Sequence, residues 1–445
     1  MKLRNHLSLK VLLAFVAVSL TFFSCKDYND LDVEQNSGDA DFTTVVAVGN
    51  SLTAGFQSNA LFESAQRYSF PAIVAGQMAG VNNFEQPIIS DPGIGGRLEL
   101  DGSDLSGPIP TEEQGTPQNA DLDRPYNNLG IPGAILADFT GTDLPGLPYS
   151  ARQSNNPFFD IVLRDMGSTQ AAQMTSLEPT FVMFWLGNND VLGYVTSGGN
   201  TPYTPAGPQG FAGLYQASMQ QISATGADAV LYNIPNVTTI PFVFLVNNLL
   251  LQEGTITVNQ NNNFALVTPQ GDVPIWVETT DPSNPGVVQD TTIMNAPNPG
   301  AGQPGGFFLL SARETLPQLF QNGTGLSPNN PIPHSLVLDN GETTQAVQLV
   351  NQYNQTISSL ASSNGFALVD INTAFSDIIA NGGITVDGVS LTPTPGSLFS
   401  FDGVHPANQG HGIVANLTIE AINDTYNANL PPVDVSEIPQ GIPIQ

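Results

Sequence analysis

Basic residues are the scarcest feature of this 445-residue chain. It has 10 Lys and Arg residues against 39 Asp and Glu residues, and its net charge is −29. No lysine follows Lys26, and neither Lys nor Arg follows Arg313. A protein that binds nucleic acid needs a basic patch to neutralise phosphates. The composition therefore excludes nucleic acid as an expected partner.

Cysteine and histidine are also rare. Cys25 is the only cysteine, so no disulfide within the chain can stabilise the fold. The four histidines are His6, His334, His405 and His411. His6 lies in an N-terminal segment that we expect to be removed. A histidine that serves as a general base must therefore be one of the other three.

Long apolar runs are absent except near the N-terminus. A positively charged start is followed by an apolar run over residues 11–23, which is too short to cross a bilayer comfortably and is typical of a signal peptide. The run ends at Ser24, directly before Cys25, and this arrangement resembles a bacterial lipoprotein signal. An ordinary secretory signal with a chance cysteine is the alternative.

The lipoprotein resemblance implies a location and an anchor. Residues 1–24 would be removed, and Cys25 would carry the lipid. Residues 25–41 are polar and acidic and predict a flexible tether. We therefore expect an exported protein that is lipid-anchored to the bacterial outer membrane or the cell surface, with the membrane as a partner.

Strand-like and helix-like segments alternate along the rest of the chain. Short apolar runs predict buried strands over residues 43–49, 179–187, 228–235 and 366–371. Apolar spacing predicts helices near residues 61–78, 211–222 and 346–360. The alternation predicts an α/β fold with a central, mainly parallel sheet covered on both faces. We expect residues 42–445 to form one domain.

Two stretches interrupt this pattern. Residues 82–125 are rich in Pro, Gly, Asp and Asn and predict a long loop. Residues from about 240 to 335 carry short β-like runs between turn-rich pieces, which predict a loop and β insertion beside the main sheet. The apolar residues 245–251 within it fit either a lipid-facing lid or a buried helix.

Three polar segments lie where the predicted sheet places functional side chains. Ser51 follows the first predicted strand, so its hydroxyl lies at the carboxyl end of the sheet, where open α/β sheets bind ligands. Asn189 follows the strand at 179–187, and its amide can donate a hydrogen bond to an oxyanion. Asp402 and His405 precede the last predicted helix, and a carboxylate can orient an imidazole that accepts a serine proton. A helix cap, an Asn-rich turn and a surface turn are the plain structural alternatives.

In this order, the segments resemble the sequence blocks of the SGNH (GDSL-like) hydrolase family. The first block matches Gly49-Asn50-Ser51-Leu52, although the family often has Asp where this chain has Asn50. The later blocks match Gly133, then Gly187-Asn188-Asn189-Asp190, then Asp402-Gly403-Val404-His405. The resemblance spans residues 43–425 and implies a three-layer αβα sandwich with a flavodoxin-like sheet.

The resemblance also implies an activity. Such a protein hydrolyses carboxylic esters through an acyl-enzyme, with Ser51 as nucleophile, His405 as general base and Asp402 as the carboxylate that orients it. The backbone N–H groups of Ser51 and Gly133 and the side-chain amide of Asn189 would form the oxyanion hole. No metal or cofactor is expected.

The sequence leaves the substrate open. The lipid anchor and the apolar residues 241–251 favour lipid esters, whereas surface display and polar insertions favour acylated carbohydrates. A surface-binding lipoprotein that has kept the fold and lost catalysis is a different class of function. His411, on the last predicted helix, and His334, in the insertion, are weaker candidates for the base.

Overall fold

The computed structural model describes residues 35–443, except residues 82, 102–103, 204, 206, 282–283, 299–303 and 442. The expected signal peptide, the expected lipidation site at Cys25 and the first part of the tether lie outside the described residues. No helix among the described residues is long and apolar enough to cross a membrane.

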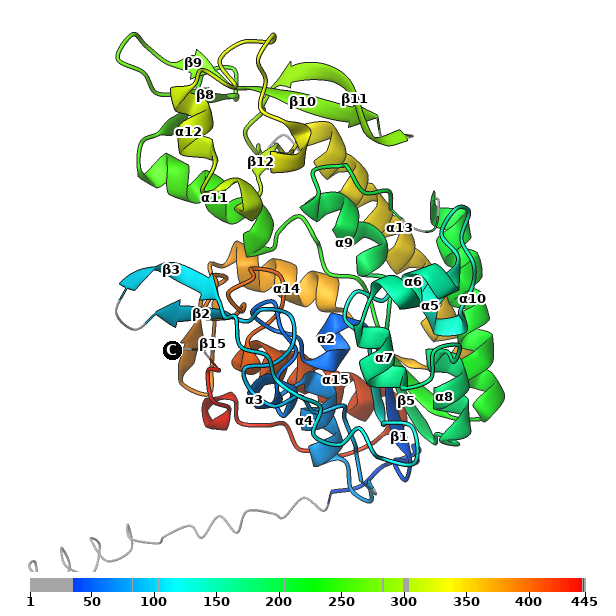
Figure 1. The fold of residues 1–445 in the computed structure, drawn as a ribbon. Coiled ribbons are helices and arrows are strands. Elements are labelled where there is room, and N and C mark those ends of the chain that lie inside the picture. Colours follow the sequence, from blue (N-terminus) through cyan, green and yellow to red (C-terminus); the bar gives the residue numbers. More distant parts are fainter. Residues whose placement is uncertain are drawn as a thin grey trace, which may run out of the picture.

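A five-stranded sheet forms the core of the main body of the protein. Its strands are β1 (Val45–Gly49), β4 (Asn128–Gly130), β5 (Phe181–Trp185), β6 (Asp228–Tyr232) and β14 (Ala367–Val369). Two of them, β1 and β5, are labelled in Figure 1. They lie in the order β14-β6-β5-β1-β4, and all neighbouring strands are parallel. Numbered along the chain, this is the order 2-1-3-4-5 of flavodoxin-like folds, whose switch point lies between β1 and β5.

Alternate residues of β5 contact helices on opposite faces of the sheet. The ring of Phe181 lies 5.7 Å from that of Tyr426 in α15 (Asn408–Tyr426), and Trp185 lies 5.3 Å from Phe70 in α4 (Phe70–Gln77). On the other face, Phe184 lies 5.6 Å from Tyr215 in α10 (Gly207–Thr225). The predicted α/β fold with helices on both faces of a parallel sheet is therefore confirmed.

The remaining elements connect and flank this sheet. The helices are α2 (Ser51–Ala54), α3 (Glu63–Gln66), α5 (Leu136–Thr140), α6 (Tyr149–Asn155), α7 (Phe158–Leu163), α8 (Gln170–Ser176), α9 (Asn189–Thr196), α13 (Asn340–Asn364) and α14 (Ile371–Ala380), with a short η4 (Val435–Glu437). Two hairpins are β2 (Leu98–Asp101) with β3 (Asp104–Pro110), and β15 (Ile384–Val386) with β16 (Val389–Leu391). The first hairpin lies in the region predicted to be only loop, so that prediction was incomplete.

The insertion between β6 and α13 lies at the top of the molecule in Figure 1. It has a hydrophobic cluster of its own. It contains α11 (Pro241–Gln252), β7 (Ile256–Val258), β8 (Phe264–Leu266), β9 (Val273–Pro274), β10 (Trp276–Asp281), β11 (Asn284–Ile293), β12 (Phe307–Phe308), η2 (Leu310–Ala312), α12 (Leu316–Gln321), η3 (His334–Leu336) and β13 (Val337–Leu338). The apolar residues 245–251 lie in α11, which buries Val246 and Leu250 in this cluster. Of the two interpretations of this segment, the buried helix agrees with the packing.

Candidate active site

Ser51 lies at the junction between β1 and α2. It is the first residue of α2, so its backbone N–H has no partner within the helix. Asn50 caps the helix, because its side-chain oxygen accepts a hydrogen bond from the Leu52 N–H at 3.1 Å. A Cβ atom at Gly49 would lie 1.9 Å from Thr53 Oγ1, so the close strand-to-helix turn requires glycine there. The turn holds Ser51 at the carboxyl edge of the sheet, beside the switch point.

Three side chains form a hydrogen-bonded series at this edge. His405 Nε2 lies 2.9 Å from Ser51 Oγ, and His405 Nδ1 lies 3.0 Å from Asp402 Oδ2. The side chains of Asp402 and His405 are each 11% exposed, and Ser51 is 7% exposed. The serine, imidazole and carboxylate that the sequence singled out are thus brought together in a partly solvent-shielded site.

Backbone groups fix the carboxylate of Asp402. Its Oδ1 accepts hydrogen bonds from the N–H groups of Val404 and His405, both at 2.9 Å. Its Oδ2 accepts a hydrogen bond from the Asn59 N–H at 3.1 Å, in addition to facing His405 Nδ1. Because Oδ1 is occupied by two donors, Oδ2 is the oxygen presented to the imidazole.

The protonation of Asp402 follows from these contacts. Burial by itself raises the pKa of the carboxyl, but the charge of His405 and the hydrogen bonds from His405 and Val404 outweigh burial and lower the pKa to about 2. The carboxylate therefore stays ionised to low pH and can stabilise a protonated imidazole.

The lowered pKa of Asp402 predicts a pH-dependent contribution to stability. The folded-state pKa lies below the ordinary value of 3.8, so the carboxylate stabilises the fold above pH 4 and loses this effect as the pH falls towards 2. We expect a contribution of about 2 to 3 kcal/mol at pH 7, of which roughly half is lost at pH 3. Urea unfolding of the wild type and of Asp402→Asn at both pH values measures it. If the difference in the free energy of unfolding between the two proteins is as large at pH 3 as at pH 7, the lowered pKa of Asp402 is contradicted.

Asn189 links two of the loops at the edge of the sheet. It is the first residue of α9, and its Nδ2 donates to the Ala134 carbonyl at 2.9 Å. An amide nitrogen carries two hydrogens, so one remains for another acceptor. Ala134 belongs to the loop after β4 that also carries Gly133, whose φ of +82° is a conformation that favours glycine. Ser51 and Asn189 line the same cavity, whereas Gly133 lies in the adjacent loop, outside the lining.

Asp190 binds the loop after β4 through a hydrogen bond. Its side chain is fully buried, and Oδ2 accepts a hydrogen bond from the Leu136 N–H at 2.9 Å. Burial raises the pKa of Asp190 well above 3.8. Asp190 therefore holds the loop after β4 through a buried hydrogen bond.

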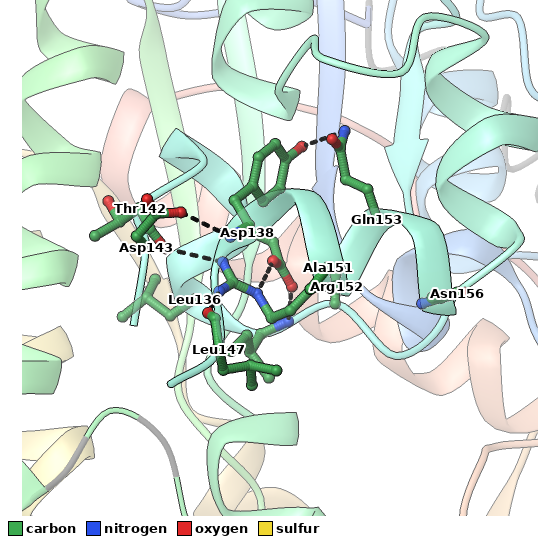
Figure 2. Close-up of polar contacts among 12 residues, drawn as sticks. Leu136, Asp138, Thr142, Asp143, Leu147, Ala151, Arg152, Gln153 and Asn156 are labelled. Carbon is green, nitrogen blue, oxygen red and sulfur yellow. Dashed lines mark hydrogen bonds and ion pairs between the residues drawn. The ribbon is translucent and has the colours of Figure 1, made fainter. Parts of the chain in front are cut away.

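A buried ion pair holds the continuation of the same loop (Figure 2). Arg152 Nε lies 2.6 Å from Asp138 Oδ1, and these side chains are 8% and 2% exposed. The guanidinium also donates to the carbonyls of Leu147 at 2.7 Å and Thr142 at 2.9 Å. Burial raises the pKa of Asp138, and the positive charge of Arg152 opposes this effect. The ion pair therefore ties α5 and the segment after it to α6.

A cavity of about 50 Å³ opens beside Ser51 and His405. Its lining includes Asn188, a residue to which the sequence analysis gave no role. Asn188 is 4% exposed, and both polar atoms of its side chain lack a hydrogen-bond partner among the described residues. The only sequence signal for Asn188 is its place directly before Asn189. A buried amide without a partner is available to a polar group of a ligand.

The other histidines do not occupy the position of a base. His411 lies in α15 and is 1% exposed, and its Nδ1 accepts a hydrogen bond from the Phe70 N–H at 3.3 Å. Burial lowers the pKa of His411 to about 3, so it is a neutral core residue. His334 lies in η3 of the insertion, with Nδ1 3.3 Å from the Gly198 carbonyl oxygen. In the part of the chain that the structure describes, no group of three or more His, Cys, Asp or Glu residues could hold a metal ion.

The chain has distant similarity to several solved structures. No protein-family model matches the chain, and no curated protein matches it. Among solved structures, it is similar to LAE5, an α/β hydrolase from the metagenome of Lake Arreo (TM-score 0.35, 12% identity, 86% of this chain and 96% of that one). It is also similar to Axe2, an acetyl-xylooligosaccharide esterase from Geobacillus (TM-score 0.34, 10% identity, 86% and 96% covered). A third is a protein of Parabacteroides merdae described as a GDSL-like lipase (TM-score 0.35, 10% identity, 87% and 99% covered). These three solved structures, which share 10–12% identity with this chain, are described as an α/β hydrolase, an esterase and a GDSL-like lipase.

Proposed function

We propose that this chain is a serine-dependent hydrolase of carboxylic esters. The observation that carries the proposal is the series Ser51, His405 and Asp402, joined by distances of 2.9 and 3.0 Å at the carboxyl edge of the sheet. A serine hydroxyl is a weak nucleophile, and an adjacent imidazole held by a carboxylate is the arrangement that activates it.

Each member of the series has a distinct role in this mechanism. Ser51 Oγ attacks the ester carbonyl carbon while His405 Nε2 accepts its proton. Asp402 Oδ2 accepts a hydrogen bond from His405 Nδ1–H, which fixes the tautomer and stabilises the imidazolium. The imidazolium then gives its proton to the leaving alcohol. Water, deprotonated by His405, attacks the acyl-enzyme and releases the acid and free Ser51.

The developing oxyanion needs hydrogen-bond donors. The backbone N–H of Ser51, the backbone N–H of Gly133 and the second Nδ2 hydrogen of Asn189 are the donors of this proposal. The bond from Asn189 to the Ala134 carbonyl supports it, because one side chain then holds the loop of Gly133 and faces the cavity of Ser51.

The proposed cellular setting follows from the N-terminus. A lipid on Cys25 and a polar tether would place the domain at the outer membrane or the cell surface, with ester groups of lipids or of acylated carbohydrates within reach. Radiolabelled palmitate incorporation that is lost in Cys25→Ala tests the anchor separately from the activity.

A fluorophosphonate probe tests the nucleophile. We expect the purified wild-type chain to be labelled and to hydrolyse 4-nitrophenyl acetate, and Ser51→Ala to lose both properties. Ser154→Ala, in α6, is a matched control that should be labelled like the wild type. An unlabelled wild type would favour the surface-binding lipoprotein, and a labelled Ser51→Ala variant would assign the nucleophile elsewhere.

A further inference from the structure

We propose that the cavity beside Ser51 is an acyl pocket, and that its substrates are esters of linear acyl chains longer than acetyl. This inference rests on the proposed ester hydrolysis and chooses between the two substrate classes that the sequence leaves open. Three observations support it: most residues that line the cavity are apolar, some of its polar groups already have hydrogen-bond partners, and Ser51 itself lines the cavity.

The wall of the cavity is mainly aliphatic and aromatic. Three elements supply most of it: α14, the segment between β6 and α11, and the loop that carries His405. The apolar lining residues are Leu52, Trp185, Leu192, Pro235, Val237, Ile240, Ile371, Phe375, Ile379, Phe399, Val404 and Pro406. Among the residues that the structure describes, no Asp, Glu, Lys or Arg side chain lines it. Such a wall stabilises bound methylene groups by removing them from water.

The polar lining groups fall into two sets. Asn50, Asn188, Asn189 and His405 lie around Ser51, at the reacting end. In the second set, the side-chain oxygens of Asn236 and Thr239 form hydrogen bonds within their own turn. Asn236 Oδ1 accepts hydrogen bonds from Thr238, and the Thr239 hydroxyl donates to the Asn236 carbonyl at 2.9 Å.

This distribution disfavours a sugar as occupant of the apolar region. Each buried hydroxyl without a hydrogen-bond partner costs free energy, and a sugar ring carries several hydroxyls. An alkyl chain has no such requirement. The polar end suits the ester group, and the apolar end suits the chain attached to it.

The wall from α14 is fixed to the catalytic loop. The rings of Phe375 and Phe399 meet edge to face, with 6.3 Å between their centroids, and both residues are almost fully buried. Phe399 lies in the loop that leads to Asp402 and His405. The apolar wall and the general base are therefore held in one packed unit, so the pocket is already formed beside the nucleophile.

Ile379 offers a site for filling the pocket. It lines the cavity from α14 and is half-buried, so a larger side chain there can enter the cavity without disrupting the sheet. The adjacent residue of the same helix, Ala380, is exposed and does not line the cavity. Ile379→Trp and Ala380→Trp are thus matched variants that place the same indole inside and outside the pocket.

A series of 4-nitrophenyl esters from acetate to octanoate tests the pocket. We expect kcat/KM of the wild type to rise about fourfold per buried methylene and to peak beyond acetate. Ile379→Trp should lower the octanoate-to-acetate ratio at least about tenfold, from loss of two or more methylene contacts, and Ala380→Trp should keep the wild-type ratio. A wild-type peak at acetate, or equal ratios in the two variants, would overturn the acyl pocket.

A binding measurement separates this inference from the proposed function. Fluorescence titration of Ser51→Ala with a fluorescent fatty acid should show binding that octanoate displaces and that Ile379→Trp abolishes in the same background. If such binding occurs but no ester is hydrolysed, the pocket stands and the esterase proposal fails. If acetate is hydrolysed through Ser51 without fatty-acid binding, the pocket fails and the esterase proposal stands. Octanoyl glycerol and phosphatidylcholine vesicles, assayed at equal ester concentration, distinguish a soluble ester from a membrane lipid as the source of the chain.

Discussion

Replacing Asp402 by Asn is expected to lower kcat for 4-nitrophenyl esters by about ten-thousand-fold, as loss of the correct histidine tautomer does in a protease with a Ser-His-Asp triad. The Asn oxygen would keep the place of Oδ1, where it accepts from the N–H groups of Val404 and His405. Its NH₂ group would then face His405 Nδ1, which must become an acceptor. His405 Nε2 would carry the proton and could no longer accept one from Ser51.

The opposite orientation of the Asn amide does not rescue the site. It would point the NH₂ group at the two N–H donors of Val404 and His405. In the first orientation the NH₂ group meets only one backbone donor, the Asn59 N–H, so the opposite orientation costs more free energy. Steady-state kinetics on Asp402→Asn, with circular dichroism to confirm folding, measures the effect. A folded variant that retains more than about one hundredth of wild-type kcat would mean that His405 is oriented by another group.

Removal of Arg152 is expected to give the largest loss of stability among single changes near the site. Arg152→Met leaves the Asp138 carboxylate buried without its cationic partner, and breaking a buried pair in this way costs about 3 to 5 kcal/mol. The carbonyls of Leu147 and Thr142 also lose donors. Urea unfolding at pH 7 gives the change in the free energy of unfolding.

The double variant Asp138→Asn with Arg152→Met separates charge burial from lost packing. Asn at position 138 can still accept the hydrogen bond that the Ile135 N–H now makes to Asp138 at 2.8 Å. We expect the double variant to recover more than half of the loss, since no unpaired charge remains. A double variant as unstable as Arg152→Met alone would assign the loss to the carbonyl contacts of the guanidinium.

The strands that were predictable are those with continuous apolar runs. β1, β5 and β6 are buried along nearly their whole length, so their sequences carry the signal of a central parallel strand. β4 carries no such run, because Asn128-Leu129-Gly130 is too short and too polar. It is a strand because it pairs with β1, with Ala47 opposite Asn128, and because Asn128 Nδ2 donates to the Thr53 carbonyl at 2.8 Å. Such tertiary pairing is invisible in local propensity.

The hairpin of β2 and β3 was missed for a related reason. Pro108 and Pro110 lie in β3, and proline is depleted in strands because it lacks an N–H to donate. A two-stranded hairpin outside the main sheet tolerates proline, since one edge of each strand has no partner strand. Composition alone therefore favoured a loop.

The residues that meet at the site were more predictable than their surroundings. Ser51, Asp402 and His405 could be singled out because each occupies a motif whose residue types suit one role. The Asn59 N–H that binds Asp402 could not be predicted from the sequence, since any residue can supply a backbone N–H. The cavity-lining role of Phe375 and Ile379 could not be predicted either, because in the sequence they are ordinary apolar residues of an amphipathic helix.

The distance along the chain between Ser51 and His405 has a consequence for biogenesis. The two residues are 354 positions apart, and their contact forms only when one of the last loops of the chain docks against the first strand-to-helix turn. All five strands precede this loop in the chain, and α15, which packs on the sheet, follows it, so a partly folded chain can pair its strands and still lack this contact. Regained turnover in a refolding experiment would consequently mark the final docking step, whereas circular dichroism would report the earlier formation of the sheet.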